Sequence, residues 1–136
     1  MNIESTKEDL LSQKRFELLA GEKPIIEGLS SYLKSSLNVI SCRAALTSQR
    51  IVVCKKNIIG GMMLFGIAGA AVSLVRKQTK IMFQILLSDI VHVKKMKHGF
   101  SKKYRFTTRL NDNYDLQFTH PERWENELKL LDISIE

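Results

Sequence analysis

The sequence predicts a mainly β (α+β) fold: an antiparallel β-barrel or sandwich capped by a C-terminal α-helix, with a short N-terminal helix. Three observations predict this class. Apolar and polar residues alternate with period two in several short segments of the chain. Turn-forming residues separate these segments. One amphipathic stretch with helical spacing follows the last of them, and its apolar face must be buried on the sheet.

The chain has the length and composition of one folded domain. Its 136 residues are 44% hydrophobic, which is enough to bury a core. Capping-box patterns begin at Ser5 and Thr6, and Gly21 can end a helix, so we expect a helix over about residues 6–20. The N-terminal helix (residues 1–20) is therefore expected to precede a main domain over residues 21–136.

Six segments have the composition or alternation of β-strands. They cover residues 24–29, 39–46, 50–55, 81–93, 104–110 and 114–118. Polar residues at 47–49 and 111–113 predict hairpin turns. Within the region 81–93 we expect four core residues: Ile85, Leu87, Ile90 and Val93.

The C-terminal helix has the clearest pattern. Pro121 fits its first position, and Thr119 or His120 can cap it. Three apolar residues follow at spacing i, i+4 and i+7: Trp124, Leu128 and Leu131. We expect Trp124 to close an open end of the barrel or sandwich.

Positive charge is concentrated in the middle of the chain. The net charge is +7, yet residues 41–109 hold fourteen basic side chains and only one acidic side chain, Asp89. Six of these cations fall within residues 94–105: Lys94, Lys95, Lys97, Lys102, Lys103 and Arg105. This stretch joins two predicted strands, so we expect a loop or hairpin tip that binds anionic lipid headgroups while Met96 and Phe100 enter the membrane interface. A solvated tip that protects a sheet edge is the alternative.

Residues 58–75 form an uncharged, glycine-rich insertion between basic flanks. Eighteen residues are at the lower limit for a membrane span, and predicted strands on both sides disfavour one. The insertion can instead pack on its own sheet, contact a second chain through small residues, or dip into a bilayer. The residues expected to make the membrane or oligomer contact are Met62, Met63, Phe65, Gly66, Gly69, Ala70 and Ser73.

No pattern typical of catalysis is present, so we expect no enzyme activity, no cofactor and no metal. The three histidines are scattered, and the sequence has no phosphate-binding loop or nucleophile motif. Cys42 and Cys54 lie in apolar stretches and are expected to be free thiols, although a disulfide across a hairpin is an alternative. The sequence shows no signal peptide, so we expect a cytoplasmic protein, in which association at the membrane would be peripheral.

The order of these segments resembles the GRAM and bacterial pleckstrin-homology (PH)-like domains. The similar stretches are residues 19–25, 46–53, 85–93 and 104–118 and the Trp124 helix, and the resemblance covers residues 18–131. It implies a PH-like fold without catalysis, and such domains often bind membranes, phosphoinositides or proteins. The insertion at residues 58–75 departs from the pattern.

Within the predicted hairpin at residues 46–53, Thr47 can form a side-chain turn bond. Arg50 can point to solvent or to an acidic residue such as Asp89.

Three functions fit these observations. The leading hypothesis is a binding module at an anionic membrane surface. The alternative is a partner-protein interaction or self-assembly domain, which would make the chain a homo-oligomer. Nucleic-acid binding ranks third, because the acidic C-terminal helix would repel phosphates.

Overall fold

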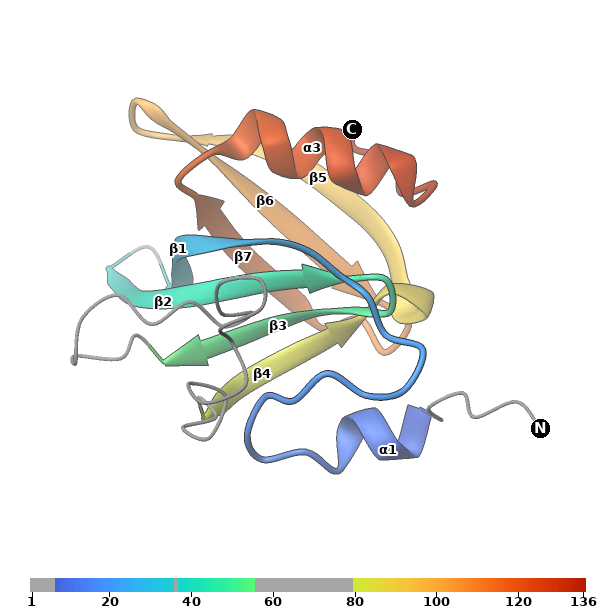
Figure 1. Ribbon diagram of the computed structural model, residues 1–136. Helices are drawn as coiled ribbons and strands as arrows, with labels where there is room; N and C mark the ends of the chain where they lie inside the picture. The colour runs from blue at the N-terminus through green and yellow to red at the C-terminus, as the bar shows by residue number, and fades with distance from the viewer. Residues whose placement is uncertain (1–6, 36, 56–79) are drawn as a thin grey trace.

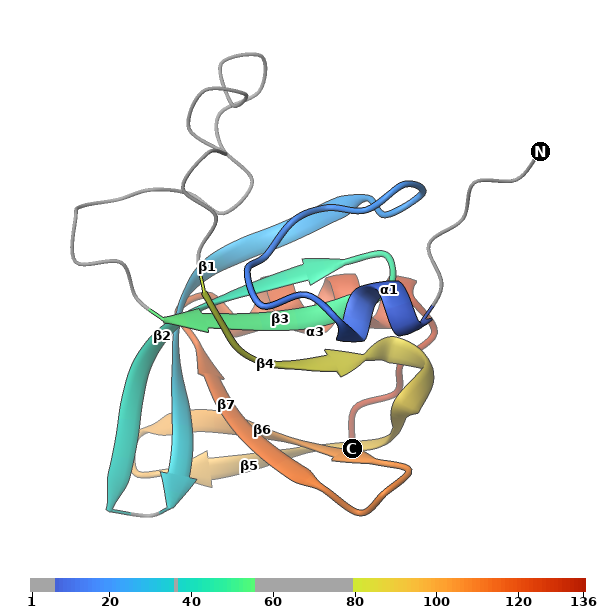
Figure 2. The ribbon, with the colours of Figure 1, turned by 90° about the horizontal axis from the view of Figure 1, so that it is seen from below.

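The protein folds as one curled antiparallel sheet with a helix across it (Figures 1 and 2). The structure, a computed structural model, describes residues 7–35, 37–55 and 80–136. The seven strands lie in the order β4-β3-β2-β1-β7-β6-β5. Their bounds are Pro24–Ser35 (β1), Asn38–Thr47 (β2), Arg50–Lys55 (β3), Ile81–Leu86 (β4), Ile90–His98 (β5), Ser101–Thr108 (β6) and Asn113–Phe118 (β7).

Strand β1 joins the two halves of the sheet. It pairs with β2 along most of its length but with β7 only through residues 30–32. This short contact lets the two halves face each other across one apolar core, as in a half-barrel. The predicted fold class, mainly β with a C-terminal helix, is therefore confirmed.

Helix α3 (Pro121–Leu130) covers this core (Figure 1). Trp124 is 3% exposed, and its ring stacks on Phe118 at a centroid distance of 4.0 Å. Leu128 is fully buried, and Pro121 occupies the start of the helix as predicted. The predicted side-chain cap is wrong: His120 takes the cap position without a side-chain bond, and the Thr119 hydroxyl donates to the Leu29 carbonyl.

The predicted strand region 81–93 is two strands on opposite edges of the sheet. A single turn of 3-10 helix, η1 (Leu87–Asp89), separates β4 from β5. The backbone N–H of Leu87 donates to Gln49 and that of Arg109 donates to Asp89, so the turn is held from both halves. The polar Ser88 within η1 is where the apolar pattern breaks.

The N-terminal helix α1 (Lys7–Leu11) is shorter than the predicted range of residues 6–20. Residues 12–23, the N-terminal strap, cross the outer face of the sheet instead (Figure 2). Phe16 is 5% exposed and packs on Val52 and Cys54. Because the strap covers the outer face and the core covers the inner face, β3 is buried on both sides.

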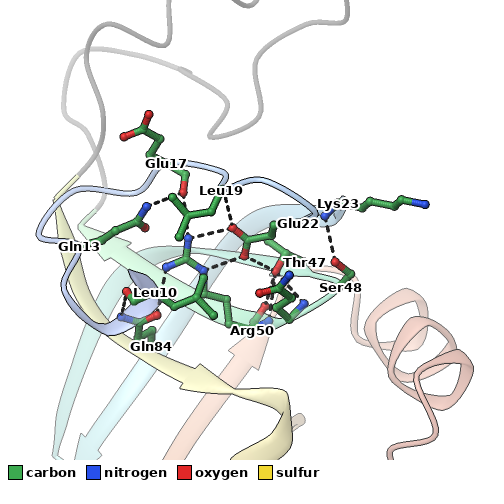
Figure 3. Close-up of polar contacts among 11 residues, drawn as sticks. Leu10, Gln13, Glu17, Leu19, Glu22, Lys23, Thr47, Ser48, Arg50 and Gln84 are labelled. Atoms are coloured by element: carbon green, nitrogen blue, oxygen red, sulfur yellow. Dashed lines mark hydrogen bonds and ion pairs between the residues drawn. The ribbon is translucent and has the colours of Figure 1, made fainter. Parts of the chain in front are cut away.

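A buried ion pair holds the strap in place (Figure 3). The Arg50 guanidinium is fully buried and donates to Glu22 at 2.7 Å and 3.0 Å. It also donates to the Gln84 side chain and to the carbonyl of Glu17. The Glu17 carbonyl of the strap therefore accepts a hydrogen bond from Arg50 instead of from an N–H group within a longer helix. The predicted contact between Arg50 and Asp89 is wrong, since Asp89 pairs with Lys7.

Thr47 links the β2–β3 turn to this network. Its hydroxyl oxygen accepts the N–H groups of Gln49 and Arg50, which confirms the predicted turn bond. The same hydroxyl donates to Glu22 at 2.6 Å. Burial opposes ionisation of Glu22, but the hydrogen bonds from Arg50 and Thr47 outweigh it and lower the pKa of this carboxyl.

Both cysteines are free thiols, which confirms the prediction. They lie on opposite faces of the sheet. Cys42 belongs to the main core and Cys54 to the cluster under the strap. Burial raises the pKa of the Cys54 thiol to about 12 and also raises the pKa of Cys42. Neither thiol is therefore a nucleophile at neutral pH.

Candidate functional site

The basic stretch at residues 94–105 forms the β5–β6 hairpin. Sequence reasoning expected mostly loop, but the strands run to His98 and resume at Ser101. Only Gly99 and Phe100 form the turn, and Gly99 adopts a φ of 64°, a conformation that favours glycine. The cations are therefore held at fixed positions on two paired strands.

The pairing of the strands divides the cations between two faces. Residues directly opposite each other in an antiparallel pair share a face. Val93 pairs with Phe106, and both are fully buried, which defines the inner face of the hairpin. Alternation along the strands gives the members of each face. Lys95, Lys97 and Lys102 lie on the inner face, and Lys94, Lys103 and Arg105 lie on the outer face.

Three of the six cations are bound by carboxylates. Asp115 on β7 accepts from Lys103 at 3.1 Å and from Arg105 at 2.8 Å. Burial opposes ionisation of Asp115, but these two partners outweigh it and lower the pKa of the carboxyl. The hydrogen bond to Asp115 raises the pKa of Arg105 in turn. Glu125 on α3 accepts from Lys95 at 2.9 Å.

The other three cations, Lys94, Lys97 and Lys102, form no ion pair with any residue that the structure describes. All three are exposed. Lys97 and Lys102 lie opposite each other near the turn, whereas Lys94 lies farther along the hairpin, opposite Arg105. Phe100 in the turn is fully exposed, at 113% relative accessibility. We call these three cations and the exposed ring the hairpin tip (residues 94, 97, 100 and 102).

A second exposed apolar residue lies at the same end of the molecule. Leu37, between β1 and β2, is 96% exposed. The end of β1 and the β5–β6 turn both lie on the left of Figures 1 and 2. Sequence reasoning missed Leu37. The available signal was one apolar residue between short polar residues at a strand end.

The uncharged insertion at residues 58–75 lies outside the described residues, and so do the seven contact residues expected within it: Met62, Met63, Phe65, Gly66, Gly69, Ala70 and Ser73. Strand β3 ends at Lys55, and β4 begins at Ile81, at the same end as the hairpin tip (Figure 1).

A cleft of about 540 Å³ lies beside the hairpin tip. Its walls come from the middle of β1 and β2, the end of β7, the β5–β6 turn and the start of α3. Lys102 is the only charged residue among its lining residues. Its lining residues on β1, β2 and β7 belong to both faces of the sheet: Ser30, Cys42 and Phe118 face the inner side, and Ser31, Ser41 and Gln117 face the outer side.

No group of three or more potential metal ligands lies together within residues 7–35, 37–55 and 80–136. None of the helices in these ranges is long and apolar enough to cross a bilayer.

Comparison with known proteins identifies the fold. No family model matches the chain, and no curated protein matches it in sequence. Among solved structures, the linker–DH/PH domains of p115-RhoGEF align over 84% of this chain, with 8% identity and a TM-score of 0.55. The DH/PH fragment of PDZRHOGEF, solved in complex with human RhoA, aligns over 82% of it, with 14% identity and a TM-score of 0.53.

The chain spans less than a third of these structures, 29% and 28% of their lengths. At this identity the likeness shows the fold alone, and this chain has a PH-like fold. The GRAM resemblance stays a prediction.

Proposed function

We propose that this chain is a non-catalytic binding module that associates reversibly with anionic membranes through the hairpin tip. One observation carries the proposal: Phe100 is fully exposed at the turn of a hairpin that carries three exposed cations without ion pairs. Exposing an aromatic ring to water at the end of a hairpin is unfavourable. The ring is suited to enter the interfacial region of a bilayer while lysines contact phosphates.

The expected strength follows from the number of unpaired cations. Each cation near an anionic surface contributes about 1 kcal/mol, so the three together contribute about 3 kcal/mol. Burial of one Phe side chain adds about 2 kcal/mol. These gross values support reversible recruitment rather than permanent anchoring. Exposed Leu37 at the same end supports a contact through two turns.

Co-sedimentation with vesicles tests this proposal. The variant Lys94→Gln/Lys97→Gln/Lys102→Gln should bind anionic vesicles on the order of 100-fold more weakly than the wild type, and wild-type binding should weaken in salt. Lys14, Lys23 and Lys129 are exposed cations elsewhere. Their triple Gln variant has the same net charge and should bind like the wild type. Equal losses in both variants would mean that total charge, not the tip, governs binding.

A second candidate, protein interaction, is favoured by the edge of the sheet at β5. The chain's own C-terminal residues pair with this edge: Glu136 donates to Val93 and accepts from Lys95. An edge that accepts an extended segment suits strand addition by a partner. The PDZRHOGEF fragment was solved with a protein bound, RhoA. If the folded chain does not bind anionic vesicles, protein interaction becomes the favoured function.

A further inference from the structure

The edge of the sheet at β5 is partly covered by the chain's own residues 133–136, which we call the C-terminal segment. Ile135 lies opposite Val93 in a parallel bridge. The N–H of Glu136 donates to the Val93 carbonyl at 2.9 Å, and the Glu136 carbonyl accepts from the N–H of Lys95 at 2.8 Å. The backbone of this edge therefore accepts an extended segment that runs parallel to β5.

The side chains of the C-terminal segment alternate between two surroundings. Ile133 and Ile135 are half-buried and pack against the main core. Ser134 and Glu136 are exposed. Successive side chains of an extended segment point to opposite sides, so two aliphatic residues at alternating positions cover the core beside β5.

Glu136 lies beside basic residues of β5. Its carboxylate is 2.7 Å from Nε2 of His92. Lys94, two residues farther along the strand, lies on the outer face of the hairpin and forms no ion pair with any described residue. Charge complementarity of this kind selects a partner and fixes its register. An acidic residue directly after the second aliphatic residue therefore suits this edge.

The C-terminal segment is held by few interactions. It makes two backbone hydrogen bonds with β5, whereas β6 pairs with the same strand along residues 90–98. Asp132, directly before the segment, has a φ of 61°, a conformation that glycine adopts more readily than aspartate. A competing segment therefore has few contacts to displace.

The C-terminal segment also leaves space beside β5. A cavity of about 510 Å³ is lined by this segment, by the start of β5 and by Leu87 and Ser88 of η1. Val91 lines the same cavity and is 60% exposed. A longer extended segment at this edge can cover Val91 and so gain an apolar contact.

We propose that the β5 edge binds an extended segment of a partner protein in which two aliphatic residues at alternating positions are followed by an acidic residue. The C-terminal segment has this pattern and occupies the edge until the partner displaces it. The proposal rests on protein interaction, the second candidate function, and does not require membrane association.

A peptide titration followed by NMR tests the proposal. The probe is a synthetic peptide with the sequence of residues 131–136, and the control peptide has serine in place of both isoleucines. The probe should shift the amide resonances of Val93 and Lys95, and the control peptide should not. Probe binding that shifts other amides instead would overturn the β5 site while retaining protein interaction as a function. No binding of the probe would overturn the site as well.

Two matched variants test the displacement. Ile135→Ser weakens the C-terminal segment, whereas Leu130→Ser changes a residue of α3 that is 77% exposed. Because the resident segment competes with the probe, Ile135→Ser should bind the probe about tenfold more tightly than the wild type. Leu130→Ser should bind it like the wild type. Equal affinities of the two variants would contradict the competition.

A melting temperature serves as the folding control for Ile135→Ser. If this variant does not fold, hydrogen exchange of the wild type replaces it. The amides of Lys95 and Glu136 should then exchange before those of β6, because the segment leaves the edge by local opening. Exchange of these amides only together with those of β6 would overturn displacement.

The remaining outcomes separate the possible occupants and the two candidate functions. A wild-type dimer in light scattering that Ile135→Ser dissociates would identify a second copy as the occupant and overturn the partner proposal. Ile135→Ser should bind anionic vesicles like the wild type, because the substitution leaves the hairpin tip unchanged. Failure of the edge site therefore leaves membrane association intact, and loss of vesicle binding in Ile135→Ser alone would contradict the separation of the two sites.

Discussion

Arg50 and the lysines of the hairpin tip are cations in opposite surroundings. Arg50 is fully buried, and its guanidinium donates to Glu22, Gln84 and the Glu17 carbonyl. Lys97 and Lys102 are exposed, and no described residue forms an ion pair with them. The first cation holds the strap on the sheet, and the others remain available to an external anion. Burial and hydrogen bonding, rather than the number of cations, decide whether a cation stabilises the fold or remains available to a ligand.

Removing the buried cation should have the largest effect on stability. Arg50→Met leaves Glu22 buried without its counter-charge, so we expect the free energy of unfolding to fall by about 3–5 kcal/mol. Urea denaturation measures this change. Lys97→Met at the tip is the matched control and should change stability by less than about 0.5 kcal/mol.

Similar small losses in the two variants would contradict the distinction between the buried and exposed cations. If Arg50→Met does not fold, hydrogen exchange of the wild type provides the second measurement. It should then show that the amides of β3 are among the best protected.

Acid should weaken the fold next most strongly. The folded-state pKa values of Glu22, Asp115 and Glu125 are lowered, because hydrogen bonds from basic partners outweigh burial. A lowered carboxyl pKa contributes stability that is present above the unfolded-state pKa, about 4, and is lost as pH falls through the folded-state value. Unfolding free energies measured from pH 7 downward should therefore decline below about pH 5. A flat profile across this range would show that these carboxylates are not stabilised in the fold.

Removing the carboxylate that binds two hairpin cations should have the smallest effect on stability. It should strengthen binding to anionic vesicles instead of weakening it. Asp115→Asn removes the partner of Lys103 and Arg105. The pairs are partly exposed, so we expect a loss of about 1 kcal/mol in stability. The variant gains one positive charge at the hairpin and should bind anionic vesicles about fivefold more tightly. Unchanged or weaker binding would mean that the hairpin does not face the membrane.

Local pattern predicted most of the fold. The period-two alternation and turn residues located the hairpins, and the i, i+4, i+7 spacing placed Trp124 and Leu128 in the core, because both signals depend on neighbouring residues. The strap could not be predicted in this way. Phe16 and Glu22 take their positions from partners on β3, far away in sequence. Leucines near a capping box therefore resembled a longer helix.

The candidate site was predictable only in part. The cluster of cations at residues 94–105 is visible in sequence, but Asp115, which binds two of them, lies on the next strand. Only the pairing of β6 with β7 brings Asp115 opposite Arg105. The cleft is still less accessible to sequence reasoning, because its lining residues come from several strands and no motif connects them.

Depth-dependent fluorescence quenching tests the membrane-facing tip most directly. Phe100→Trp places a probe at the tip, and Leu110→Trp places one in the β6–β7 turn at the opposite end of the molecule (Figures 1 and 2). Leu110 is also strongly exposed, at 85%. Trp124 is buried in both variants and provides a constant background. With anionic vesicles that contain brominated lipid, the probe at position 100 should shift to the blue and be quenched, while the probe at position 110 should not change. Quenching at position 110, or at neither position while the protein is bound, would contradict the account.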